Sequence, residues 1–218
     1  MEGVSGLMAS LPGLIQAVEE PAAAAEPAGP TQWMGAPAKS YANISASVEL
    51  AGLDMLNASG ADARTLFAAA KPSGRAADGV ESETDEQLML FVPLQAVSKV
   101  HSIQITSLAA ADADDDEAPS RPRTVKLFCN THHILGFEEA DEREPTQTVV
   151  LAPGDWNAAG TATIATKFVR FQSVNAITLF FVDVERDGAE KVRVDRVRLV
   201  GEVMGERVDM GKLKQADE

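Results

Sequence analysis

The sequence predicts an all-β fold, an antiparallel β-sandwich, from three observations. Short runs rich in β-branched and aromatic residues follow one another from Gln87 to Val200. Polar or glycine-containing turns separate these runs at intervals of roughly ten residues. One amphipathic helix is expected, at the amino-terminal edge, which leaves too few helices for the alternating strands and helices of a parallel α/β fold.

The chain is expected to divide into four segments. Val4, Leu7, Leu11 and Leu14 recur at helical spacing, which places them on one face of a helix. The Ala- and Pro-rich stretch that follows has little to bury, so the domain is expected to begin near Tyr41. The predicted segments are an amphipathic helix at residues 1–20, a linker at 21–40, the β-sandwich at 41–202 and a flexible polar tail at 203–218.

The first predicted strands precede an acidic loop. Gln87–Leu94 is a short continuous apolar run, typical of a strand in a sandwich core, and Pro93 is expected to end it. The run 100–105 alternates isoleucine with polar residues, which indicates a half-buried strand. The stretch 111–122 is too rich in carboxylates to be buried and is predicted to be a solvated loop.

The remaining strands follow closely after the acidic loop. In the last of them the apolar residues before Asp195 share one parity and those after Arg196 share the other, so a β-bulge is expected between them. Asp187 and Gly188 supply a turn between the last two strands. The predicted strands are 124–129, 146–151, 168–174, 176–182 and 191–200.

The composition restricts the class of protein and its partners. A chain of 218 residues that is 45% hydrophobic can bury one sizeable core. Its formal net charge of -14 repels phosphate backbones and anionic lipid, so neither nucleic acid nor a membrane is expected as a partner. No apolar run approaches the ~20 residues that span a bilayer, and the amino terminus lacks the basic first region of a secretory signal. We therefore expect a soluble intracellular protein, and a monomer.

Cys129 is the only cysteine, which excludes an intramolecular disulfide and a C-x-x-C redox pair. With His132 and His133 it offers soft ligands for zinc, but no second Cys/His pair accompanies them. A cysteine nucleophile is the other hypothesis, although residues three apart on an extended strand diverge. Because Cys129 shares parity with Val125 and Leu127, the favoured interpretation is a small core hydrophobe. No metal, cofactor or catalytic residue is predicted.

Two charged groups are candidates for contact with a protein partner. The run Phe137–Gln147 concentrates carboxylates among few apolar residues, which predicts an exposed loop that recognises a basic surface through charge. Basic residues gather on the later strands, either as a solvated outer face or as a surface that docks carboxylates, namely Lys167, Arg170, Lys191, Arg193, Arg196 and Arg198. The candidate contact residues are Glu138, Glu139, Asp141, Glu142, Arg143, Glu144, Arg196 and Arg198.

Trp156, in the turn PGDWN, is the alternative candidate for a binding residue. It is the one aromatic ring in a loop that could stack on a carbohydrate or another small ligand. The competing interpretation is that the ring plugs one end of the sandwich. Both interpretations remain open from the sequence, because a shared fold does not by itself fix a function.

Five segments together resemble a known family. The most specific are FEEADEREPTQ (137–147) and RFQSVNAITLFF (170–181), and ESETDEQLMLFVPL (81–94), RTVKLFCN (123–130) and RVRLVGE (196–202) agree with them. They are similar to the PITH domain family, whose name refers to proteasome interaction and to a thioredoxin-like protein that carries the domain at its carboxyl-terminal end. The resemblance implies a jelly-roll-like β-sandwich, similar to galactose-binding-like domains.

The resemblance also implies a function. It is that of a non-enzymatic adaptor that docks on the regulatory particle of the 26S proteasome, in the cytoplasm and nucleus. The family associates no catalytic residues with the domain, so none is carried over. Because this sequence has no C-x-x-C motif, it looks like a stand-alone member, and disulfide reductase activity is not expected. Binding of a carbohydrate or small ligand at the sandwich loops is the alternative, and a Cys-dependent enzyme is a remote one.

Overall fold

The computed structural model describes residues 41–60, 62–68, 72, 79–109 and 118–206, and these form an antiparallel β-sandwich, as predicted. The predicted amino-terminal helix and linker lie outside the described residues. So does most of the predicted tail, although the last strand runs to Glu206 and therefore includes the first residues of that segment.

The described elements follow the chain in this order. The strands are β1 (Ala42–Asn43), β2 (Asp54–Leu56), β3 (Ala58–Gly60), β4 (Val80–Ser82), β5 (Leu88–Thr106), β6 (Thr124–Cys129), β7 (Gln147–Val150), β8 (Thr161–Ala165), β9 (Val174–Phe181), β10 (Arg193–Val194) and β11 (Arg196–Glu206). The helices are α1 (Phe137–Glu142) and the short 3-10 helices η1 (Ser45–Ser47), η2 (Leu50–Gly52), η3 (Ala63–Phe67), η5 (Pro153–Asp155) and η6 (Phe168–Phe171). None of the helices in the described ranges has the length and apolar character to cross a membrane.

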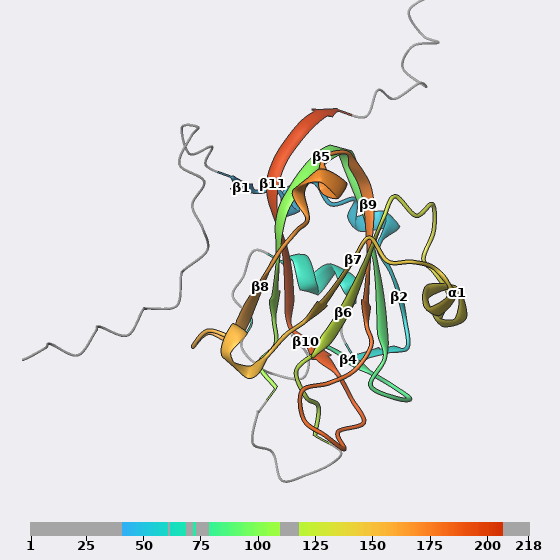
Figure 1. Ribbon diagram of the computed structural model, residues 1–218, viewed down its shortest axis with the longest axis vertical. Coiled ribbons are helices and arrows are strands. Elements are labelled where there is room, and N and C mark those ends of the chain that lie inside the picture. Colours follow the sequence, from blue (N-terminus) through green and yellow to red (C-terminus); the bar gives the residue numbers. More distant parts are fainter. Residues whose placement is uncertain (1–40, 61, 69–71, 73–78, 110–117, 207–218) are drawn as a thin grey trace, which may run out of the picture. The chain divides into compact units, whose positions relative to one another are not determined.

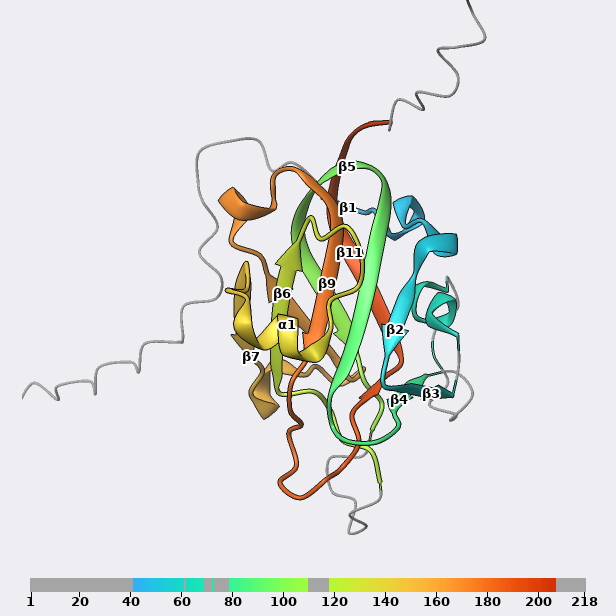
Figure 2. The ribbon, with the colours of Figure 1, turned by 90° about the vertical axis from the view of Figure 1, so that its right-hand side faces the viewer.

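Strand β5 joins the two layers of the sandwich. Its first half, Leu88–Pro93, pairs with β9 and β2, and its second half, Ala96–Thr106, pairs with β11 and in part with β8. Figures 1 and 2 show β5 arching over one end of the sandwich, where its register shifts. The first layer therefore holds β2, β9, β6 and β7, and the second layer holds β1, β11 and β8. A separate three-stranded sheet has the order β10-β4-β3.

The main core lies between the two layers. Ile103 and Ile105 of β5, Leu127 of β6, and Val197 and Leu199 of β11 are all fully buried in it. Each of them alternates along its strand with a residue that points away from the core, which is the predicted pattern of a sandwich strand. Burial of an aliphatic side chain of this size contributes about 1.5–3 kcal/mol to folding.

The predicted strand at residues 168–174 is wrong in its first part. Phe168–Phe171 forms the 3-10 helix η6, and β9 begins only at Val174. A strand would place Val169 and Phe171 on one face, whereas Val169 is 84% exposed and Phe171 is fully buried. The 3-10 turn separates these two side chains and still delivers Phe171 to the core.

Pro93 does not end the strand that contains it, as the sequence had predicted. The two runs expected as separate strands are parts of the continuous β5. The carbonyl of Pro93 accepts a hydrogen bond of 2.9 Å from the Glu49 N–H. The nitrogen of a strand residue points to the same side as its carbonyl, so the Pro93 nitrogen faces the β2 side of β5. The pairing with β2 has already ended there, at Phe91. A proline is tolerated at such a position because the missing N–H has no strand partner there.

The predicted change of inward face at Asp195 is confirmed, but its cause is a change of sheet. Residues before Asp195 belong to β10, which pairs with β4, and residues after it belong to β11, which pairs with β5. The expected β-bulge at this point is therefore wrong. The turn predicted at Asp187 and Gly188 is present, with Gly188 at φ 84°, although β9 and β10 lie in different sheets and form no hairpin.

A β-bulge does occur farther along β11. The register with β5 shifts between Val200 and Gly201, which leaves His101 of β5 as the extra residue. The imidazole of His101 stacks on Tyr41, with ring centroids 4.1 Å apart. Gly201 allows the close approach of the two backbones, because a Cβ atom at this position would clash with the carbonyl oxygen of Lys99.

Candidate functional site

The acidic run forms helix α1, so the prediction of an exposed loop is wrong for its secondary structure. Gly136 precedes the helix, and its carbonyl accepts a hydrogen bond of 2.9 Å from the Ala140 N–H. Glu138 and Glu139 lie in the first turn, where negative charge interacts favourably with the helix dipole. Pro145 follows the last turn, and a proline there cannot continue a helix.

Helix α1 is fixed to the outer side of the first layer. Ala140 is fully buried in a second cluster with Met89 of β5, Phe128 of β6 and Phe180 of β9. The ring of Phe137 lies 5.6 Å from that of Phe180. Figure 2 shows α1 lying across β6 and β9. A six-residue helix is too short to be stable by itself, so this apolar contact determines its position.

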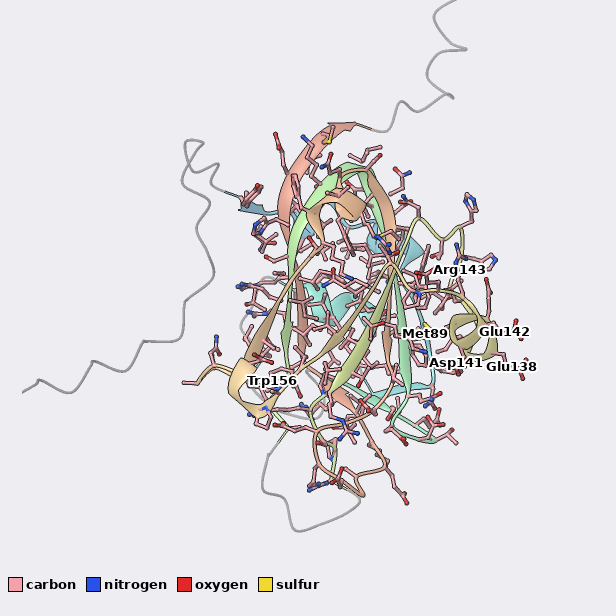
Figure 3. All side chains as sticks on the ribbon, in the orientation of Figure 1. Met89, Glu138, Asp141, Glu142, Arg143 and Trp156 are labelled. Carbon is pink, nitrogen blue, oxygen red and sulfur yellow. The ribbon has the colours of Figure 1, made fainter. Side chains whose placement is uncertain are left out.

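Most of the charged side chains of α1 point away from this contact. Figure 3 shows Glu138 and Glu142 directed outward, Asp141 on the side of the helix that faces the sheet, and Met89 between the helix and the sheet. Two ion pairs join them to neighbours, namely Asp141 with Lys126 at 2.8 Å and Glu139 with Arg143 at 3.7 Å. The predicted contact residues that α1 and its carboxyl end bring together, all exposed, are Glu138, Glu139, Asp141, Glu142, Arg143 and Glu144.

Lys126 belongs to this surface, although it is not among the contact residues predicted from the sequence. Its ammonium group lies 5.4 Å from the centre of the Phe180 ring and also contacts Asp141. It therefore connects the strand beneath to the helix above. The sequence gives only a weak signal for this contact. Lys126 is one of the polar residues of an alternating strand, and the local sequence does not indicate which carboxylate lies near it.

The other two candidates, Arg196 and Arg198, lie on the second layer. Val197 and Leu199, which alternate with the two arginines along β11, face the main core. Both arginines therefore point to the outer side of the strand. The outer sides of the two layers are on opposite faces of a sandwich, so the structure does not place these arginines beside α1. Arg196 is only 7% exposed, which differs from the fully solvated face considered in the sequence analysis.

The predicted basic group is not one surface. Arg193 is buried and forms ion pairs of 2.7 Å with Asp195 and with Glu81. Burial lowers the pKa of Arg193, but its hydrogen bonds to Asp195 and the charge of that carboxylate raise the pKa above its usual value overall. Arg170 lies on η6 instead of on a strand. The basic residues are thus divided between a buried network, a 3-10 helix and the outer face of β11.

Cys129 is partly buried against the main core, in agreement with the favoured interpretation. Burial raises the pKa of its thiol to about 11, against a smaller opposing effect of Thr146. A thiol with such a pKa forms little of the nucleophilic thiolate near neutral pH. His132 and His133 are both exposed, and among the described residues no three His, Cys, Asp or Glu side chains form a group that could hold a metal ion.

Trp156 is buried in the main core and does not offer a stacking platform. It is 8% exposed and belongs to the main core, and the guanidinium of Arg121 lies 5.5 Å from the centre of its ring. Figure 3 shows Trp156 at the β8 side of the molecule, away from α1. Because the ring is buried, it does not offer a face on which a sugar could stack. Its burial agrees with the interpretation that it plugs one end of the sandwich, which stays a prediction.

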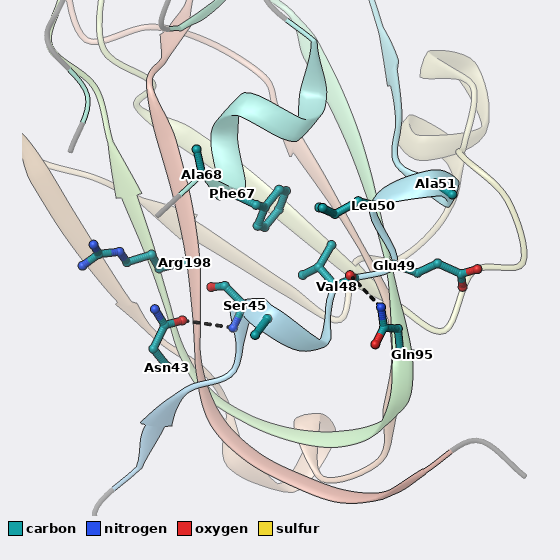
Figure 4. Close-up of a pocket in the computed structure, with 11 residues that line it drawn as sticks. Asn43, Ser45, Val48, Glu49, Leu50, Ala51, Phe67, Ala68, Gln95 and Arg198 are labelled. Atoms are coloured by element: carbon teal, nitrogen blue, oxygen red, sulfur yellow. Dashed lines mark hydrogen bonds between the residues drawn. The ribbon is translucent and has the colours of Figure 1, made fainter. Parts of the chain in front are cut away.

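A cavity of about 570 Å³ lies between η1, η2 and η3, beside β11. Figure 4 shows Val48, Leu50 and Phe67 on one side of it and Arg198 on the other. The Ser45 N–H donates to the Asn43 side chain at its rim. Arg198 also lines a second cavity of about 490 Å³, together with Arg196. Arg198 thus lines both cavities.

Comparison with known proteins identifies relatives of the whole domain. The profile of the PITH domain matches residues 35–218. Thioredoxin-like protein 1 of Schizosaccharomyces pombe is 32% identical over 184 residues, which are 84% of this chain and 58% of that protein. The chain thus spans little more than half the length of this relative.

Solved structures resemble the fold. The CBM32-1 and CBM32-2 domains of ZmpB from Clostridium perfringens match 74% of this chain and 36% of that chain, with a TM-score of 0.50 and 8% identity. The CBM32-3 domain of a family 31 glycoside hydrolase from Clostridium perfringens matches 72% of this chain and 97% of that one, with a TM-score of 0.44 and 10% identity. At such low identity the similarity concerns the fold alone. The first of these structures, with its TM-score of 0.50, agrees with the predicted jelly-roll-like β-sandwich.

Proposed function

The chain belongs to the PITH domain family, and from this membership we propose that it is a non-enzymatic adaptor that docks on the regulatory particle of the 26S proteasome. The observation that carries the proposal is helix α1, a rigid charged surface within the segment that most specifically resembles the family. A surface held by a buried apolar contact loses little conformational entropy on binding, which favours recognition. The charges of α1 would guide a basic partner surface into register.

The chemistry of the described residues agrees with an adaptor. The thiol of Cys129 is partly buried and has a raised pKa, and the His132 and His133 side chains are exposed to solvent. No step of nucleophilic catalysis is favoured by this arrangement. The activity of the thioredoxin-like relative is not carried over, because this chain spans 58% of that relative and contains one cysteine.

Affinity purification of the tagged chain from a eukaryotic lysate, followed by quantitative mass spectrometry, tests the proposal. The test variant is Glu138→Lys with Glu142→Lys on α1, and the matched control is Glu83→Lys with Glu190→Lys, two exposed carboxylates outside α1. Both variants change the net charge equally. We expect proteasome subunits with the parent chain and the control, and recovery reduced roughly tenfold with the α1 variant.

The outcomes separate the partner from the surface. Absence of proteasome subunits from the parent purification would overturn the partner. Equal recovery of proteasome subunits with the α1 variant and the control would overturn α1 as the contact surface. The change in net charge, which both variants share, would then explain any reduced recovery.

A further inference from the structure

Strand β7 is an edge of the first layer, and its outer side is open (Figure 2). The Leu151 N–H that follows the strand donates a hydrogen bond of 2.7 Å to the Arg123 carbonyl, and Val149 faces β6 in the same way, two residues earlier. Thr148 and Val150 therefore direct their N–H and C=O groups away from β6. In the part of the chain that the structure describes, no hydrogen bond uses these four groups.

The β7 edge lacks the features that usually prevent an open strand from pairing. Proteins protect such edges with a lysine, a proline, a bulge or a covering segment. The sequence of β7 is QTVV, which contains three β-branched residues and no charge. Thr148 is exposed, and Val150 is 64% exposed. The other edge of the first layer, β2, has only three residues and begins with the charged Asp54.

Contacts before the open segment hold β7 in place. The Arg170 guanidinium donates a hydrogen bond of 3.1 Å to the Thr146 carbonyl, which ends the row of open backbone groups. The buried Gln147 side chain donates to the carbonyl of Ala165 and accepts from the N–H of Lys167. An edge that is already extended and fixed loses little conformational entropy when a strand is added to it.

Acidic side chains lie near the amino-terminal end of this edge. Thr148 is directly opposite Lys126 of β6, so the two side chains share the outer face of the layer. The Lys126 ammonium forms an ion pair of 2.8 Å with Asp141 of α1. Glu144, which is exposed, lies three residues before β7 begins. An antiparallel strand added to β7 would therefore have its carboxyl end nearest to these carboxylates.

We propose that β7 accepts an extended segment of a protein partner as an additional antiparallel strand, an inference that rests on the proposed docking function. The segment carries β-branched residues opposite Thr148 and Val150, and lysine or arginine at its carboxyl end, where it meets the acidic side chains. Its backbone supplies the hydrogen bonds that the four open groups lack. A second copy of the chain would offer β7 itself, which carries no basic residue.

NMR of the purified full chain with the acetylated, amidated peptide Val-Val-Thr-Val-Lys-Lys tests this edge. At a peptide concentration about ten times its Kd, we expect the Thr148 and Val150 amides to exchange with solvent roughly tenfold more slowly. The Val149 amide, which already faces β6, should be unchanged. The matched peptide Val-Val-Thr-Val-Glu-Glu should bind roughly tenfold more weakly, because its carboxylates meet those of the chain.

Two variants of one residue separate the backbone from the side chain. Thr148→Pro removes an outward N–H that β6 does not use, and proline is tolerated at such an edge position. Thr148→Val keeps the N–H and is the control. We expect Thr148→Pro to weaken binding of the lysine peptide at least about tenfold and Thr148→Val to leave it within about twofold. The thermal transition of each variant verifies that it folds, and the exchange measurement on the parent chain needs neither variant.

The results distinguish this inference from the proposed function. Absence of lysine-peptide binding, unchanged exchange at Thr148 and Val150, or equal binding by folded Thr148→Pro and Thr148→Val would each overturn the edge as a docking site. Equal binding of the two peptides would overturn the basic chemistry of the partner. Slower exchange on raising the chain concentration without peptide would assign the edge to a second copy. None of these measurements involves the proteasome, so its absence from the affinity purification would overturn the docking function separately.

Discussion

At the scale of single residues, the environment of Cys129 decides whether its thiol is available as a thiolate nucleophile. The thiol lies against the main core at the end of β6, next to the hydroxyl of Thr146, which accepts a hydrogen bond from the Cys129 N–H. Burial disfavours the thiolate and raises the pKa of the thiol to about 11. The sequence predicted this role from the parity of Cys129 with its apolar neighbours, and the structure agrees.

The raised pKa predicts a pH dependence of stability. The thiol keeps its proton in the folded chain at pH values where the unfolded chain, with a pKa near 9.0, has lost it. The contribution is therefore fully present below pH 9 and is lost as the pH rises toward 11. Relative to Cys129→Ala, the parent chain should lose about 2 kcal/mol of unfolding free energy between these limits, measured by urea titration. Parallel curves for the two proteins would contradict this.

At the scale of elements, the local sequence predicted β5, β6, β7, β9, β10 and β11, but not β1 to β4 or β8. It also failed where contacts between distant segments decide the structure. The strands at Thr124–Cys129 and Gln147–Val150 were predicted almost to the residue, because alternation of side chains is a local signal. Helix α1 was missed because its stabilising contact comes from the sheet beneath it. A usable signal was present in Phe137 and Ala140, three residues apart after Gly136.

The bulge between β5 and β11 provides a test of local geometry. Gly201→Ala should lower the unfolding free energy by roughly 1–3 kcal/mol, because the new methyl group would clash with the backbone at Lys99. Gly205→Ala is a matched control in the same strand, since a Cβ atom there would meet nothing within 4 Å. Chemical denaturation of both variants measures the difference. A Gly201→Ala variant as stable as Gly205→Ala would show that the backbones are not in close contact.

At the scale of the whole molecule, a buried ion network couples the separate sheet to the main sandwich. Arg193 of β10 forms an ion pair with Glu81 of β4. Asp195 forms an ion pair with Arg193 and accepts a hydrogen bond from the backbone N–H of Leu108, which lies just after β5. Asp195→Ala should therefore cost roughly 3–5 kcal/mol, since it leaves a buried guanidinium with less compensation. Glu139→Ala, which removes an exposed ion pair of α1, should cost less than about 1 kcal/mol. Equal midpoints of the two variants in guanidinium chloride would contradict the coupling.

The candidate site shows what the sequence can and cannot predict about the whole molecule. The sequence predicted which charged residues are candidates, and six of them do lie together because they are neighbours in the chain. It could not predict that Arg196 lies beside Thr106 and Thr161, because strand register and the arch of β5 bring those rows together. Nor could the sequence distinguish the buried Arg193 from Arg198, because both residues occupy similar positions in the same charged run.

The proposed function of this sandwich is to dock on the 26S proteasome. Equilibrium binding of the fluorescently labelled, purified chain to purified 26S proteasome is the decisive measurement. We expect saturable binding that weakens roughly tenfold for Glu138→Lys with Glu142→Lys and is unchanged for Glu83→Lys with Glu190→Lys. Absence of saturable binding at proteasome concentrations up to about 10 µM would contradict it.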